Sequence, residues 1–156
     1  MKRIVCSLLI LFSGLLAFGQ TWDVNVKVDY SKALICDMDE ESYAIIESDW
    51  YKDKVEITHK LTTELLKETK KFLKLKLSSP ITLLVTVNSI GKEGEFNCDA
   101  EVIGENKETI LSVKDIRRCT ATSFWITNLR RMKINARDEG WELGRALKEQ
   151  YKEKYK

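Results

Sequence analysis

The sequence has little of several residue types on which whole classes of protein depend. It holds one proline and seven glycines in 156 residues, and 44% of its residues are hydrophobic. Disordered chains are poor in core-forming residues, and collagen-like chains are rich in glycine and proline, so this composition argues against both. The sequence therefore predicts an ordered globular protein.

Metal and cofactor ligands are equally scarce. His59 is the only histidine, and the four cysteines include no Cys-x-x-Cys pair, so the ligands of a zinc site are missing. The chain also lacks a Gly-rich phosphate-binding loop and the Gly-x-Ser-x-Gly turn of many hydrolases. We expect no metal and no cofactor, and we expect His59 to be a solvated helix residue.

The start of the chain differs from the rest. Lys2 and Arg3 precede an apolar run over residues 4–16, and small residues stand just before the end of this segment at Gly19. This is the layout of a secretory signal, so we expect cleavage after Gly19 and export to the periplasm or the extracellular space. The run is shorter than the ~20 residues that a membrane-spanning helix needs, and no later stretch is long enough.

Cleavage would divide the chain into a signal peptide, residues 1–19, and a single domain, residues 20–156. It would remove two basic residues and leave 24 basic residues against 24 acidic ones. A neutral domain that is exported is not expected to bind nucleic acid, whose phosphates attract cationic proteins.

Alternation of apolar and polar residues predicts four strands. The first covers residues 22–30, with tryptophan, valine and tyrosine on one face and charged or amide side chains on the other. The same period of two recurs over residues 81–88, 96–102 and 109–116, and short turns join these three segments. The three later strands are therefore expected to form an antiparallel meander.

Helical signals lie between the first strand and the meander, and again at the C-terminal end. Asp39 is a candidate N-cap, and Asp53 with Glu56 resembles a second helix start. Whether residues 39–77 hold one bent helix or two stays open from the sequence. A long helix is predicted from about residue 121 to the end.

The order strand, helix, three strands, helix predicts an α+β fold. We expect a two-layer sandwich in which helices cover one face of a four-stranded mixed sheet. Gly140 and Gly144 lie on the apolar stripe of the last helix, where glycine costs helix stability. Their position indicates that this helix packs closely against the sheet.

Three cysteines would remain after cleavage. If the first strand is parallel to the second, the first and fourth strands end at the same edge of the sheet. Cys36 closes the first strand and Cys119 follows the fourth, whereas Cys98 lies on the core face, where a free thiol behaves as a small hydrophobe. We therefore predict a Cys36–Cys119 disulfide, with Cys98 reduced.

The polar face of the predicted sheet is the candidate ligand face. Paired carboxylates about 5–9 Å apart can hydrolyse glycosidic bonds, and such a face can also bind a polar ligand. An ordinary solvated sheet surface is the alternative, because nothing marks one pair as special. The candidate residues are Asp23, Lys27, Asp29, Asp99, Glu101 and Lys114.

Charge is unevenly spread along the domain. Acidic residues gather over residues 37–49 without a counter-ion nearby in sequence, and basic residues gather over residues 114–133 and again from Arg145. A basic amphipathic helix can lie on an anionic membrane surface. Basic residues at a helix C-terminus also complement the helix dipole, and this second interpretation needs no partner.

Four segments of the chain resemble those of small uncharacterised secreted proteins of Bacteroidota-type bacteria. They are Phe18-Gly19-Gln20, Val26-Lys27-Val28-Asp29-Tyr30-Ser31, Glu47-Ser48-Asp49-Trp50-Tyr51-Lys52-Asp53-Lys54 and the Gly140-x-x-x-Gly144 helix. The resemblance implies a sheet-plus-helices domain of the cell envelope and supplies no catalytic residue. This chain departs from the pattern after the fourth strand, where Arg117-Arg118-Cys119-Thr120 stands in place of a Gly-rich turn.

Three hypotheses follow for the function. The first is a non-enzymatic envelope or secreted domain that binds a protein, a surface or a small polar ligand. The alternatives are a carboxylate-dependent hydrolase on the open sheet face and a peripheral membrane protein attached by its basic C-terminal helix. A deep cleft with carboxyl groups of raised pKa would favour the hydrolase, and a flat charged sheet would favour the binding domain.

Overall fold

A computed structural model of the chain describes residues 19–118 and 127–155. The predicted signal peptide, apart from its last residue, lies outside the described residues, and so does Cys119. Within them, no helix is long and apolar enough to cross a membrane.

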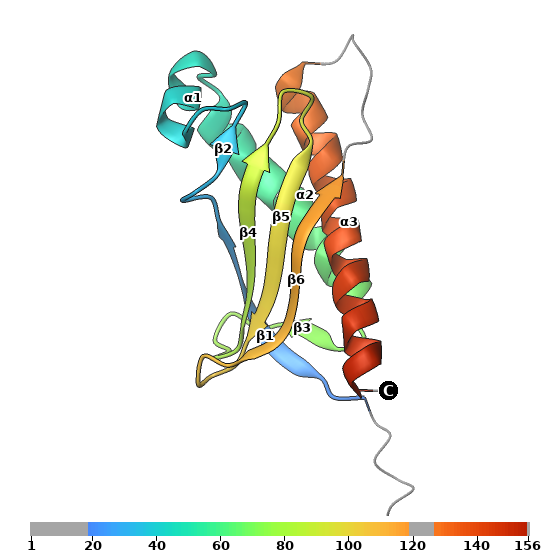
Figure 1. The fold of residues 1–156 in the computed structure, drawn as a ribbon. Helices are drawn as coiled ribbons and strands as arrows, with labels where there is room; N and C mark the ends of the chain where they lie inside the picture. Colours follow the sequence, from blue (N-terminus) through green and yellow to red (C-terminus); the bar gives the residue numbers. More distant parts are fainter. Residues whose placement is uncertain (1–18, 119–126, 156) are drawn as a thin grey trace, which may run out of the picture.

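Four strands form where the alternation predicts them. They are β1 (Trp22–Asp29), β4 (Thr82–Ile90), β5 (Phe96–Ile103) and β6 (Thr109–Arg118). β1 runs parallel to β4, and β4, β5 and β6 form the expected antiparallel meander (Figure 1). Every second residue of β5 is buried, so the sequence period reflects one covered face and one open face.

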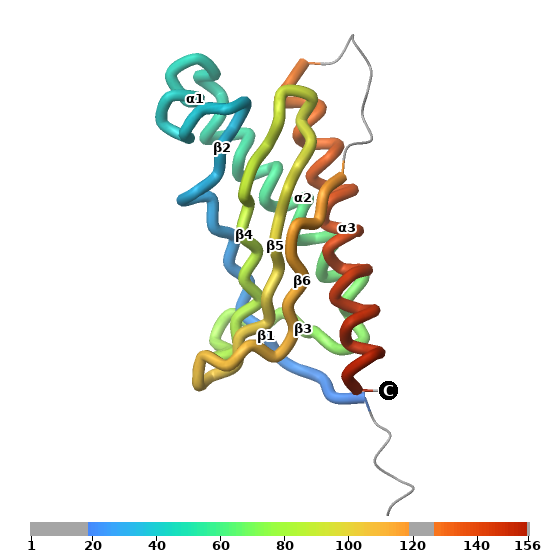
Figure 2. The backbone as a smooth tube through the Cα atoms, viewed as in Figure 1, coloured from blue at the N-terminus to red at the C-terminus, as the bar shows by residue number. Residues whose placement is uncertain are grey.

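The sheet has six strands, not the predicted four. β3 (Leu73–Leu75) pairs with the start of β1, and β2 (Leu34–Ile35) pairs with the end of β4, both in parallel. The strand order is β3-β1-β4-β5-β6, with β2 beside β4. β1 and β2 therefore follow one another along the same edge of β4 (Figure 2). Strands of two or three residues are too short for their alternation to be recognised.

Two helices, rather than one bent helix, connect β2 to β3. They are α1 (Glu40–Ile46) and α2 (Trp50–Thr69). Asp39 caps α1 as predicted, because its carboxylate accepts a hydrogen bond from the backbone N–H three residues on, at 2.8 Å. The second predicted start is wrong: α2 begins three residues before Asp53, whose carboxylate instead lies 2.8 Å from the ammonium group of Lys133.

The C-terminal helix, α3 (Asn128–Tyr155), packs on α2 and on β5 and β6. Figure 1 shows α2 and α3 behind the sheet, whose other face is open. Gly140 and Gly144 face α2, which corrects the expectation that they face the sheet. A Cβ atom at Gly140 would collide with the backbone carbonyl of Leu61, and one at Gly144 would lie 2.6 Å from Cβ of Glu68. The two glycines bring the helices together.

The core lies between the covered face of the sheet and the long helices. Its largest fully buried side chains include Trp50, Phe72 and Phe96. Cys98 is buried on the core face of β5, as expected. Cys36 is buried after β2 and is not bonded to Cys98. Because Cys119 lies outside the described residues, its disulfide with Cys36 stays a prediction.

Candidate functional site

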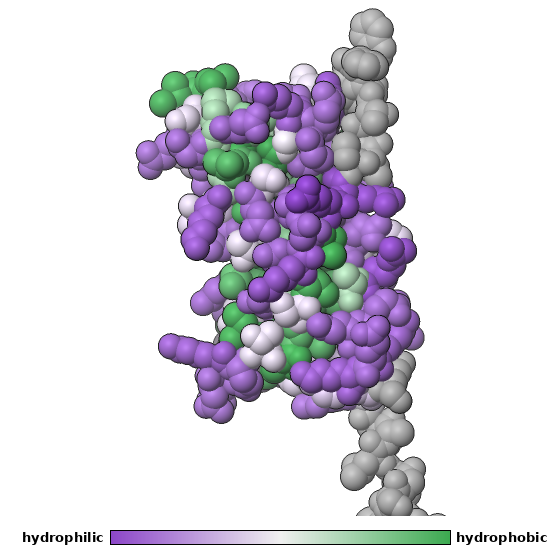
Figure 3. All heavy atoms as spheres, viewed as in Figure 1, coloured by the Kyte–Doolittle hydropathy of each residue, from purple (hydrophilic) through white to green (hydrophobic). Residues whose placement is uncertain are grey.

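Five of the six residues of the candidate ligand face lie on the open side of the sheet. The strand register places Lys27 in one row with Glu101, across β4, and places Asp29 in one row with Asp99. The Lys114 ammonium group lies 3.7 Å from a carboxylate oxygen of Glu101. Figure 3 views the molecule from this side and shows hydrophilic side chains over much of the face.

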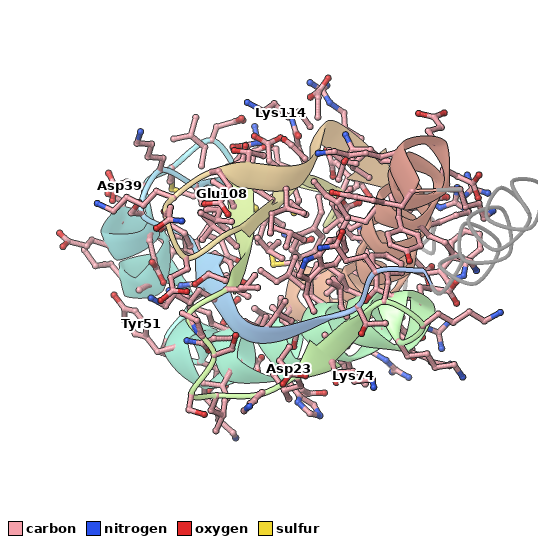
Figure 4. All side chains as sticks on the ribbon, turned by 90° about the horizontal axis from the view of Figure 1, so that it is seen from below. Asp23, Asp39, Tyr51, Lys74, Glu108 and Lys114 are labelled. Atoms are coloured by element: carbon pink, nitrogen blue, oxygen red, sulfur yellow. The ribbon has the colours of Figure 1, made fainter. Side chains whose placement is uncertain are left out.

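Asp23 lies apart from the other five. Its carboxylate is 3.3 Å from the Lys76 ammonium group, and Figure 4 shows Asp23 beside Lys74, on the side of the molecule opposite Lys114. The first three residues of β1 pair with β3 and the following ones with β4 on the other side. Because twisted strands turn their faces along their length, residues of equal parity in β1 do not all share one surface.

The carboxylates of the open face are occupied by hydrogen bonds within the sheet. Asp99 accepts a bond from the backbone N–H of Asp115 at 2.8 Å, and Asp115 accepts bonds from Asn97 at 3.0 Å and Arg117 at 2.8 Å. The hydrogen bond from Arg117 lowers the pKa of Asp115. A hydrolase needs a carboxyl group that keeps its proton near neutral pH, and this lowered pKa has the opposite direction.

The described carboxyl group whose pKa rises belongs to Glu139, in the middle of α3. Burial favours its neutral form and raises its pKa to about 8. The residue is fully buried. The Cys98 thiol and the backbone of Arg118 lie close enough to its carboxyl group to lower the pKa, but burial has the larger effect. Its neighbour Cys98 is also buried, and burial raises the pKa of that thiol. A substrate at the surface would not reach this acid.

The acidic and basic clusters pair across the fold. In the acidic cluster, which has no counter-ion within its own segment, Glu40 lies 2.5 Å from the ammonium group of Lys54 of α2. In the basic clusters, Arg118 lies 2.9 Å from Glu142, and Lys133 lies within 2.8 Å of two α2 carboxylates. These partners are remote in sequence. The pairing of Lys133 neutralises one basic side chain of the C-terminal helix that membrane attachment would use.

An apolar groove of about 670 Å³ lies between β1 and α2, where the sequence predicts no site. We call it the β1–α2 groove. Three of its side chains are strongly exposed for apolar residues, at 70% for Val55, 57% for Leu75 and 80% for Leu77. Large apolar side chains that gather at a surface commonly mark a binding site. The apolar lining consists of Val26, Val28, Val55, Leu66, Leu75 and Leu77.

The lining also has a polar end, which contains Asp29, Tyr30, Glu40, Lys54 and Thr58. The hydroxyl groups of Tyr30 and Thr58 form a 3.0 Å hydrogen bond that links the end of β1 to α2. The Lys54 ammonium group lies 4.5 Å from the centre of the Tyr30 ring and also binds Glu40. The charged groups at this end of the groove are therefore held in place by contacts within the protein.

One sequence signal for the groove is visible in retrospect. Leucine and lysine alternate over residues 73–77, shortly after the helical stripe of α2. Such alternation is typical of a strand, and β3 lies there, although its three residues are too few to predict a strand on their own. Leu75 and Leu77 end up exposed because the strand stops before it covers the rest of β1.

The described residues contain no group of three or more histidine, cysteine, aspartate or glutamate side chains placed to hold a metal ion. Comparison of the chain with protein-family models, with curated proteins and with solved structures finds no match in any of the three.

Proposed function

We propose that the protein is an exported, non-enzymatic binding domain that takes up an apolar part of its ligand in the β1–α2 groove. The observation that carries the proposal is the exposure of Val55, Leu75 and Leu77 around one groove with a charged end. Ligand sites are typically concave, mainly apolar, and supplied with a few polar groups that fix orientation. The groove has each of these properties.

The open sheet face offers less support as the site. Charged residues of this face pair with one another, as Lys114 and Glu101 do. Of the six candidate residues, only Asp29 also lines the groove. Export is proposed on the basic and apolar start of the sequence alone.

A neutral apolar dye, Nile red, tests the proposal. We expect it to bind the protein with an increase in fluorescence, and we expect Leu77→Asp to weaken binding about tenfold, because a carboxylate would replace an apolar contact. Ile46→Asp is the matched control, since Ile46 is 70% exposed on α1 and does not line the groove. Equal binding by both variants and the wild type would mean that the dye binds elsewhere and would refute the proposed site.

A further inference from the structure

We propose that the ligand of the β1–α2 groove is an extended polypeptide segment that adds to the outer edge of β1. The segment carries apolar side chains at alternate positions and a lysine or arginine beside Asp29. This inference rests on the proposed function and names the class of its ligand.

The direction of the backbone groups in β1 is the first support. The N–H of Asn25 donates to Ile81 at the start of β4, whereas the carbonyl of Val24 accepts from Lys76 after β3, both at short distances of 2.8 and 2.9 Å. Backbone groups of successive strand residues point to opposite edges. The peptide groups of Val26 and Val28 therefore point away from β4, to the side on which β3 has already ended.

The length of this free edge is the second support. It starts after Val24, the last residue of β1 that pairs with β3, and it ends at Tyr30, whose carbonyl accepts a 2.9 Å hydrogen bond from Ala33 in a turn. The free stretch is residues 26–30, about 17 Å of extended chain. An extended backbone can pair with several donors and acceptors at this spacing at once, which is how strand-addition sites bind peptides.

The side chains that border the edge define what the added strand carries. Val26 and Val28 lie on the groove side of β1, opposite Val55 and Leu66 of α2. In a strand, every second side chain points to the same face. A strand in the groove would therefore bury one set of its side chains against these apolar residues and expose the other set.

Charge at the polar end gives the added strand its orientation. The hydrogen bond from the backbone N–H of Ser31 lowers the pKa of Asp29, so this carboxylate is ionised at neutral pH. Glu40 also faces the groove, and Asp39 and Glu41 line a neighbouring hollow. Lys32 and Lys54 lie near Asp29, and the four carboxylates outnumber these two ammonium groups. A basic side chain of the ligand complements this excess.

A single strand suits the groove better than a second copy of the protein. α2 lies beside the free edge of β1 and lines the same groove. A second copy that offered its own β1 would bring its own α2 along with it. The gap between one strand and one helix accommodates an isolated extended segment without that second helix.

A proline substitution tests whether backbone pairing is used. Val28→Pro removes the N–H that points outward and leaves the pairing with β4 intact, since proline is tolerated on an edge whose N–H faces outward. Val28→Ala is the control, because it shortens the side chain and keeps the N–H. The probe is a short synthetic peptide with valine at alternate positions, threonine between them, and lysine at both ends, so that either orientation places an ammonium group near Asp29.

Isothermal titration with this peptide is expected to show the tightest binding to the wild type and slightly weaker binding to Val28→Ala, which loses apolar contact in the groove. Binding to Val28→Pro is expected to be about tenfold weaker than binding to Val28→Ala, because the proline variant also loses the outward N–H. Circular dichroism checks that both variants fold, and Nile red should bind both. Equal peptide affinity of the two variants would overturn strand addition. Dye binding without peptide binding would also overturn it, while leaving the proposed function in place. Sedimentation that revealed a dimer abolished by Val28→Pro would assign the edge to a second copy and refute the peptide proposal.

Discussion

Replacing Glu139 with glutamine is expected to raise the free energy of unfolding at pH 7 by about 3 kcal/mol. The carboxyl group has a pKa of about 8 in the folded protein, against 4.5 for the ordinary side chain. Between these values the unfolded chain has lost the proton and the folded chain keeps it, so rising pH favours unfolding. Glutamine has nearly the same shape as the protonated acid and cannot ionise.

The same reasoning predicts how the free energy of unfolding depends on pH. Below about pH 4.5 both states hold the proton and the group contributes nothing to pH dependence. From there to about pH 8 the wild type should lose roughly 1.4 kcal/mol per pH unit relative to Glu139→Gln, and above that the gap should be constant. Urea denaturation across this range measures it. Glu153→Gln, an exposed change on the same helix, should leave the profile unchanged. Parallel curves for wild type and Glu139→Gln would contradict the burial of an ionisable acid.

Replacing Gly140 with alanine is expected to destabilise the protein by about 3 kcal/mol. The added methyl group would meet the carbonyl of Leu61, which belongs to the backbone of α2 and cannot rotate away. The two helices would have to separate, and much of the core lies beneath their contact. Thermal unfolding followed by circular dichroism measures the loss.

Two companion variants make the result specific to the helix contact. Gly144→Ala should cost less, because its new methyl group would lie 2.6 Å from Cβ of Glu68 and 3.0 Å from the carbonyl oxygen of Leu65, and both separations are longer than the one between a methyl group at Gly140 and the Leu61 carbonyl oxygen. Arg137→Ala, at an exposed position of the same helix, should change stability by no more than about 0.5 kcal/mol. Gly140→Ala as stable as the wild type would mean that α2 and α3 are not in backbone contact.

The long strands were accessible from sequence because each of them has one covered and one open face. In β5, Cys98 and Ala100 are buried while Asn97 and Asp99 are not, and this alternation is local information. The cap at Asp39 was accessible for the same reason, since it involves residues three positions apart. The α+β class and the mixed sheet follow from such local signals.

What escaped prediction depends on contacts between residues far apart in the chain. β3 is a strand because β1 offers it an edge, and its three residues alone do not specify one. Lys133 was grouped with other basic residues by sequence, yet the fold places it beside Asp53. The glycines of α3 indicated a close approach correctly, but which partner they approach is decided by the tertiary structure.

The binding groove belongs to the same category. Its walls come from β1, α2 and the end of β3, and it exists because β3 stops while β1 continues. Alternation correctly predicts that Lys27 and Asp29 of β1 lie on the open face of the sheet. It carries no information about which edge of a strand is left unpaired. The accessible edge of β1 follows from the tertiary structure, because β3 pairs with only the first three residues of β1.

The central claim, binding at the β1–α2 groove, is tested most directly by amide chemical-shift mapping of the isotope-labelled protein with the lysine-ended peptide. The account predicts the largest changes at the backbone N–H groups of Val26, Val28 and Tyr30, together with slower hydrogen exchange at these sites. Changes confined to Asp99, Glu101 and their neighbours on the open sheet face, with β1 unaffected at its outer edge, would contradict it.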